Sequence, residues 1–117
     1  MTVYISPNPG KEQAVATAQQ AAQLLLMQGA TVLMRDDLNE TCCADGVQYL
    51  PLEECLPRTD VILTIGGDGT ILHEANLTLQ YQKPILGINI GRSGFLATCE
   101  VDEMEEKLAA LVRGEYL

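Results

Sequence analysis

Short apolar runs alternate along this chain with segments whose apolar residues recur at helical spacing. The run from Val61 to Ile65 is rich in β-branched residues and too short for a helix, which is typical of a strand buried on both faces. Three further strands are expected from short apolar runs at residues 3–5, 30–34 and 85–90. Residues 38–50 have no clear period and are expected to be a surface connection, with a short extended piece at its end.

Helical spacing predicts three helices and one shorter helical turn. In the first helix, over residues 11–28, the apolar residues recur every three or four positions, and Gly29 follows as a C-cap. In the last helix, Asp102 and Glu105 form an approximate capping box. The remaining segments are a helical turn at 51–58 and a helix from about 71 to 82.

The order of these elements is strand, helix, strand, connection, strand, helix, strand, helix. Such alternation implies a mostly parallel sheet with helices on both faces, which is a three-layer, Rossmann-like α/β fold. At 117 residues the chain is long enough for one domain with a sizeable core, so residues 1–117 are expected to form a single α/β nucleotide-binding domain.

The third strand runs directly into Gly66-Gly67-Asp68-Gly69-Thr70. Glycine has no Cβ, so the backbone can turn sharply there and approach a ligand closely. Thr70 is placed to cap the next helix, whose first N–H groups suit an anion. A plain strand-to-helix turn is the alternative, but three glycines around one carboxylate favour a phosphate cradle with Asp68 directed into it.

A second glycine loop follows the fourth strand, so both loops should meet at the edge formed by the carboxyl ends of the strands. Asn89 is polar within an apolar strand and needs a partner, and Gly91 begins the turn. Arg92 offers a guanidinium to phosphate, or is simply an exposed side chain of a tight turn. His73, early in the helix after the first loop, is either a donor to anions or a solvated side chain.

Two other segments carry weaker signals. Residues 6–10, after the first strand, do not fit the G-x-G-x-x-G dinucleotide fingerprint, and plain turn chemistry is favoured over approach to a ligand. Asp36 and Asp37 follow the second strand, where dinucleotide folds place a ribose-binding acid. Without the glycine fingerprint, that role is not favoured.

The net charge of −9 argues against a nucleic-acid or anionic-membrane surface. A phosphate ligand would therefore be held by backbone amides, local cations or a metal ion. The four cysteines match no zinc pattern, and no signal peptide precedes the first strand. We expect reduced thiols in a cytoplasmic protein, and no apolar run approaches the roughly 20 residues needed to span a bilayer.

The two glycine motifs together resemble those of NAD kinases, also called polyphosphate/ATP-NAD kinases. The similar segments cover the chain in element order, and they are the glycine loop with the residues after it (66–72), the fourth strand (84–91) and Gly94-Phe95-Leu96. The resemblance implies the N-terminal domain of an enzyme that transfers a phosphoryl group from ATP or polyphosphate to the adenosine ribose 2′-hydroxyl of NAD. It also implies a divalent metal, usually magnesium, and a homodimer or homotetramer.

The resemblance also implies roles for individual residues. Asp68 would be the catalytic general base, Gly69 would lie against the dinucleotide, and Phe95 would pack near the adenine. His73 matches a position where the family often has a basic residue that contacts ligand. The expected cofactor-binding residues are Gly66, Gly67, Asp68, Gly69, Thr70, His73, Asn89, Gly91, Arg92 and Phe95.

The sequence departs from the family in three places. Glu74-Ala75-Asn76 stands where Ala-Ala-Arg is common, and Ser93 stands where an apolar residue is usual. The β-rich C-terminal NAD-binding domain is absent, so the isolated chain is expected to be nearly inactive.

The alternatives are a diacylglycerol- or sphingosine-type lipid kinase, which shares the GGDGT motif, and a non-catalytic nucleotide-binding module. 6-Phosphofructokinase shares GGDG but not the layout of the chain. A purely structural domain would leave two converging glycine loops unexplained.

Overall fold

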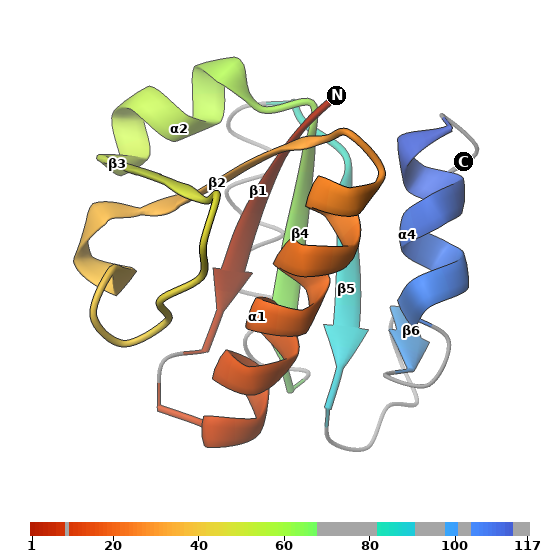
Figure 1. Ribbon diagram of the computed structural model, residues 1–117, viewed down its shortest axis with the longest axis horizontal. Coiled ribbons are helices and arrows are strands. Elements are labelled where there is room, and N and C mark those ends of the chain that lie inside the picture. Colours follow the sequence, from red (N-terminus) through yellow and green to blue (C-terminus); the bar gives the residue numbers. More distant parts are fainter. Residues whose placement is uncertain (9, 68–81, 91–97, 101–103, 114–117) are drawn as a thin grey trace.

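A parallel β-sheet forms the centre of the computed structural model, which describes residues 1–8, 10–67, 82–90, 98–100 and 104–113. Within these residues the sheet has six strands in the order β3-β2-β1-β4-β5-β6, and every neighbouring pair is parallel (Figure 1). The strands are β1 (Thr2–Pro7), β2 (Thr31–Arg35), β3 (Gln48–Leu50), β4 (Val61–Gly66), β5 (Ile85–Asn89) and β6 (Thr98–Glu100). The described helices are α1 (Glu12–Met27), α2 (Leu52–Arg58), α4 (Met104–Val112) and the short 3-10 turn η1 (Asp36–Leu38).

The predicted α/β class, the four predicted strands and the first helix are confirmed. The helix expected at 71–82 falls on residues outside the described part of the chain. One strand was missed, and another was expected only as a short extended piece. The extended piece expected before Pro51 is β3, a strand of the sheet, and β6 was not predicted at all. Both are three-residue edge strands, whose hydrogen bonds depend on the neighbouring strand more than on an apolar pattern of their own.

β1 is also longer than expected, because it continues through Pro7, which pairs with Ile65. The N–H of Asn8 donates to the carbonyl of Ile65 at 2.9 Å, and successive amides of a strand point to opposite sides. The nitrogen of Pro7 therefore faces the β2 side, where the register ends at Tyr4 with Leu33. A proline there removes no sheet hydrogen bond.

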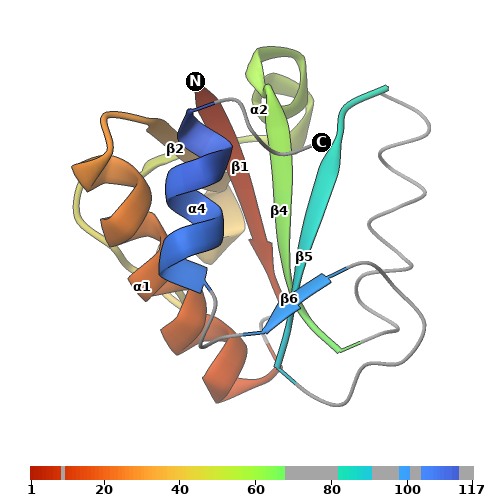
Figure 2. The ribbon, with the colours of Figure 1, turned by 90° about the vertical axis from the view of Figure 1, so that its right-hand side faces the viewer.

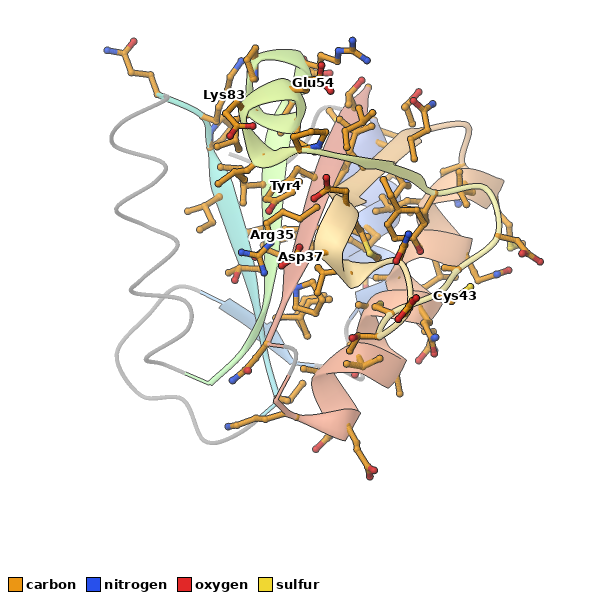
Figure 3. All side chains as sticks on the ribbon, turned by 90° about the vertical axis from the view of Figure 1, so that its left-hand side faces the viewer. Tyr4, Arg35, Asp37, Cys43, Glu54 and Lys83 are labelled. Atoms are coloured by element: carbon orange, nitrogen blue, oxygen red, sulfur yellow. The ribbon has the colours of Figure 1, made fainter. Side chains whose placement is uncertain are left out.

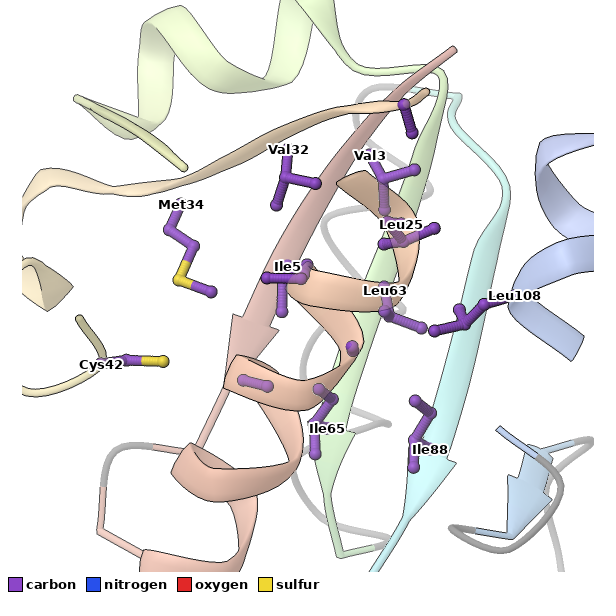
Figure 4. Close-up of a cluster of buried hydrophobic side chains, with 14 of the residues drawn as sticks. Val3, Ile5, Leu25, Val32, Met34, Cys42, Leu63, Ile65, Ile88 and Leu108 are labelled. Carbon is purple, nitrogen blue, oxygen red and sulfur yellow. The ribbon is translucent and has the colours of Figure 1, made fainter. Parts of the chain in front are cut away.

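Helices cover both faces of the sheet, as the order of elements predicts. On one face α1 and α4 pack over a cluster that includes Ile5, Leu63 and Ile65 (Figures 2 and 4). On the other face α2 packs over Tyr4 and Ile62. Because side chains alternate along a strand, consecutive residues of β1 and β4 belong to two separate cores, and this explains why most residues of these strands are apolar.

The N-terminal helix packs closely because its buried face is built mainly from alanines. Ala14, Ala18, Ala21 and Ala22 are fully buried with Leu25. The helix ends where Gly29 adopts a positive φ of 86°, and the N–H of Ala30 then donates to the carbonyl of Leu25 at 3.0 Å. Glycine suits this position, as the sequence predicts, because the left-handed conformation costs it nothing.

The strand order has a direct consequence for ligand binding. Going along the chain, strands are added on one side of β1 up to β3, and then on the other side from β4 onward. In open parallel sheets, ligands bind beyond the carboxyl ends of the strands at the point where this order reverses. Here that point lies between the ends of β1 and β4.

The β4 core can be tested with Leu63→Ala. Leu63 is fully buried, so its truncation is expected to lower the free energy of unfolding by about 2–5 kcal/mol in urea titrations. Met27→Ala is the control, because Met27 is 80% exposed and its loss should change stability by no more than about 0.5 kcal/mol. Equal effects of the two changes would contradict the arrangement of the core.

Candidate functional site

The two strands that lead into the glycine loops are neighbours in the sheet. β4 and β5 are parallel, with Gly66 opposite Asn89 at their carboxyl ends. The N–H of Ile90 donates to the carbonyl of Gly66 at 3.2 Å, which joins the two chain segments where they leave the sheet. Both loops therefore start at the same edge, as the sequence predicts.

The turn after β1 comes to the same edge and is closed by hydrogen bonds around Asn8. The side-chain oxygen of Asn8 accepts a hydrogen bond from the N–H of Gly10 at 3.0 Å. The main-chain carbonyl of Asn8 accepts one from the N–H of Lys11 at 3.2 Å. Since the N–H of Asn8 is bonded to Ile65, the turn is attached directly to the end of β4. The carboxyl ends of β1, β4 and β5 together form one edge, called here the glycine edge.

Lys11, at the start of α1, reaches across to the glycine edge. Its Nζ atom lies 3.4 Å from the point that a Cβ would occupy on Gly67. Gly67 is half-buried, whereas Lys11 is exposed. A Cβ at residue 67 would therefore be in van der Waals contact with the ammonium. Lys11 is a candidate that the sequence did not reveal, because only the strand order brings the turn after β1 beside β4.

Several predicted site residues lie outside the described part of the chain. These are Asp68, Gly69, Thr70, His73, Gly91, Arg92 and Phe95. Asn89 is described in its backbone, at the end of β5. Gly66 and Gly67 are described fully, and both lie at the edge where the prediction placed them.

The acidic pair after β2 has a structural partner within the chain. The Oδ1 atom of Asp37 lies 3.3 Å from Nε of Arg35, and Figure 3 shows the two side chains together near the end of β2. Asp36 and Asp37 are both exposed in η1. The ion pair with Arg35 accounts for the position of Asp37 without a ligand.

Cys42, Cys43 and Cys55 are free thiols, and two of them are inert by burial. Burial raises the pKa of the Cys42 thiol above its ordinary value of 9.0, and the neighbouring Cys43 raises it further. Burial also raises the pKa of Cys55, whose thiol donates to the carbonyl of Leu50 at 3.3 Å. Cys43 is exposed. Among the described residues, no three His, Cys, Asp or Glu side chains are grouped so that they could hold a metal ion.

Two open hollows lie away from the end of β4. One of about 370 Å³ is lined by Gln19, Gln23 and Asp45, and another of about 310 Å³ is lined by Gly10, Glu12 and other residues of α1. Neither Gly66 nor Gly67 lines them. No described helix has the length and apolar character required to cross a membrane.

A parallel sheet in this order, with glycines where two neighbouring strands end, defines the chain as an α/β protein of the nucleotide-binding kind. The sequence matches the ATP-NAD kinase N-terminal domain over residues 3–116. The chain belongs to this family, as its glycine motifs indicated.

Individual relatives agree with this assignment. An NAD kinase of Methanopyrus kandleri is 36% identical over 107 residues, which cover 89% of this chain and 36% of the relative. An NAD kinase of Corynebacterium diphtheriae is 34% identical over 122 residues, covering 97% and 38% of the two chains. The structure of yeast NADH kinase complexed with NADH matches with a TM-score of 0.74 at 20% identity, over 98% of this chain and 36% of that one. The chain therefore spans little more than a third of these relatives.

The Gly67→Ala variant tests whether Gly67 is needed for the fold or for the candidate site alone. Among the described residues, the new methyl group would meet only the end of the flexible Lys11 side chain, so the free energy of unfolding should change by less than about 1 kcal/mol. Gly46→Ala is the matched control. Gly46 has a φ of +88°, and its Cβ would lie 2.9 Å from Cδ1 of Leu26, so we expect a loss of about 1–3 kcal/mol. Equal losses in urea titrations would assign Gly67 to the fold.

The buried thiols predict a pH dependence of stability. The pKa values of Cys42 and Cys55 are raised in the folded chain, so above the ordinary value of 9.0 the unfolded chain ionises first. Stability is therefore fully present below that value and falls as the pH rises towards the folded pKa values. Urea titrations from about pH 8 to about pH 10 should record this fall, reduced in the Cys42→Ala/Cys55→Ala variant. An unchanged slope in that variant would refute the contribution of the thiols.

Proposed function

We propose that the chain is the N-terminal domain of an NAD kinase, which phosphorylates the adenosine ribose 2′-hydroxyl of NAD with ATP or polyphosphate as donor. The observation that carries the proposal is the pairing of Gly66 with Asn89 in a member of the ATP-NAD kinase family. This pairing puts the starts of two glycine loops side by side at the edge where such sheets bind ligands. A phosphate lying there could come close to the backbone, because glycine has no side chain to hold it away.

In this proposal Asp68 is the general base. A carboxylate is ionised at neutral pH and can accept the proton of the ribose 2′-hydroxyl. The hydroxyl oxygen then forms a bond to the terminal phosphorus of the donor. The bond from that phosphorus to its bridging oxygen breaks, and ADP leaves when ATP is the donor. Since Asp68 follows Gly67 directly, the turn at the end of β4 would set the position of the base.

The other predicted contacts complete the proposed cradle. Gly69 and Thr70 would continue the turn towards the phosphates, and His73 would add a donor from the next helix. From the second loop, Gly91 and Arg92 would approach the phosphates and Phe95 the adenine. Positioning together with charge stabilisation is the main contribution that a protein makes to phosphoryl transfer.

Magnesium enters the proposal as part of the donor. The described residues at the glycine edge offer amides and an ammonium, which suit an anion and do not ligate a cation. Mg²⁺ usually keeps several waters and binds through substrate phosphates and one or two carboxylates, where it offsets negative charge. It would therefore be bound as part of the ATP complex.

The second half of the proposed site would come from outside these residues. The relatives are close to three times as long as the matched region, and the family resemblance implies a β-rich domain that carries most NAD contacts. A homodimeric or homotetrameric full-length protein and a cytoplasmic location complete the proposal.

The role of Asp68 is tested with Asp68→Asn in the natural protein that carries this chain. Loss of the base should lower kcat for NADP formation by about 10²–10⁴-fold, while ATP and NAD affinities stay within a few-fold. Asp45→Asn, an equal charge change on an exposed loop, should leave kcat unchanged. Unchanged turnover in Asp68→Asn would contradict the base.

The same assay tests the function and the completeness of the site. NADP formation by the full-length protein, but not by residues 1–117 alone, is the expected result. Turnover by the 117 residues alone would refute the need for a second domain. Phosphorylation of diacylglycerol or sphingosine in place of NAD would favour the lipid-kinase alternative.

A further inference from the structure

The reversal of strand order brings one cation to the glycine edge. The turn after β1 and the turn after β4 flank the same gap between neighbouring strands, since β1 and β4 pair from Val3 with Val61 to Pro7 with Ile65. Across this gap the Nζ atom of Lys11 lies 3.4 Å from the Cβ position of Gly67. A residue larger than glycine would place its side chain against the ammonium.

The backbone of Lys11 is held in place by the turn and by the helix that follows. Its N–H donates to the carbonyl of Asn8, and its carbonyl accepts from the N–H of Val15 at 3.1 Å. Asn8 is itself bonded to Ile65 at the end of β4. The backbone of Lys11 is thus attached to both α1 and β4, while its side chain is exposed. Little reorganisation is needed for its ammonium to meet a ligand.

The ammonium has no carboxylate partner among the residues that the structure describes. The other described cations are placed differently. Arg35 is paired with Asp37, Arg58 and Lys83 lie near the amino ends of the strands, where α2 ends and β5 begins, and Arg113 follows the end of α4 and has an interaction of its own. In a chain with a net charge of −9, a lysine beside a glycine turn, without a carboxylate partner among the described residues, stands out as a candidate for binding an anion. Its positive charge would reduce the repulsion between this acidic chain and an anionic ligand at the edge where ligands of this sheet class bind.

We propose that Lys11 is a phosphate-binding residue, whose ammonium pairs with a nucleotide phosphate lying on the Gly66–Gly67 turn. Charge-assisted hydrogen bonds to phosphate are the strong ones, and lysine serves as a point charge for such groups. This assignment rests on the proposed function and deepens it. The phosphate belongs either to the ATP donor or to the NAD pyrophosphate, and both present the same chemistry to the lysine.

Kinetics of the full-length protein test the assignment. Lys11→Gln should raise KM for one nucleotide on the order of ten- to a hundredfold, and Lys11→Arg should restore most of the affinity. A raised KM for ATP alone identifies the donor phosphates, and a raised KM for NAD alone identifies the pyrophosphate. Lys83→Gln is the matched control, because it changes the net charge equally at the far end of the sheet and should leave both KM values within about twofold. Thermal unfolding should be similar for all variants.

Two outcomes would overturn the assignment. One is that Lys11→Gln and Lys83→Gln have the same KM values for ATP and for NAD. The other is a fall in kcat alone with a shift of its acidic pH limb, since the lysine would then act on the ionisation of Asp68 and not on phosphate.

Direct binding separates this inference from the proposed function. If the wild-type protein forms no NADP, the proposed function fails, and calorimetric titration with ATP and with inorganic tripolyphosphate still tests Lys11. Weaker binding of these probes by Lys11→Gln than by Lys83→Gln supports the phosphate contact. Equal binding by the two variants, or no binding by the wild type, refutes it.

Discussion

The parallel pairing of β1 with β4 is the constraint on which the rest of the structure depends. The two strands are consecutive in space but about sixty residues apart in the chain, and they pair over five residues from Val3 to Pro7. Their side chains supply both cores, with Ile5 and Leu63 under α1 and with Tyr4 and Ile62 under α2. The same pairing fixes which turns meet at the carboxyl edge. A shift of register by one residue would exchange the two faces and move Lys11 away from Gly67.

Elements with a strong pattern of their own could be predicted from the sequence. The β4 strand was placed to within one residue because a continuous β-branched run leaves few other options, and α1 because its apolar residues recur over four turns. β6 could not be found in this way, and β3 was expected only as an extended piece, since an edge strand of three residues is defined by its neighbour's hydrogen bonds. Pro7 was assigned to a loop because proline cannot donate a hydrogen bond within a sheet. It is accommodated in β1 because the pairing of β1 with β2 ends before Pro7.

The residues of the candidate site also differ in how well the sequence predicts them. The meeting of the strands that carry the two glycine loops follows from the parallel order, so Gly66 and Asn89 were expected at one edge. Lys11 was not expected, because a lysine at the start of a helix looks like any solvated side chain. Its significance comes from the order of the strands, which places α1 beside β4 although β2, β3 and α2 come between them in the chain. Sequence patterns indicate local structure well, but a contact between distant turns depends on the whole topology.

The glycine edge also explains why a domain of this kind would need a partner for chemistry. Glycines allow close approach of a phosphate, but they contribute no side chain, and one ammonium only partly offsets the acidic charge of the chain. Wherever such an edge is open to water, amides and a lysine act through a high dielectric, and each contact is then worth little. Covering that edge with a second domain would exclude water and strengthen the same contacts without changing them. The sheet would then position the groups that contact phosphate, and the covering domain would strengthen those contacts by excluding water.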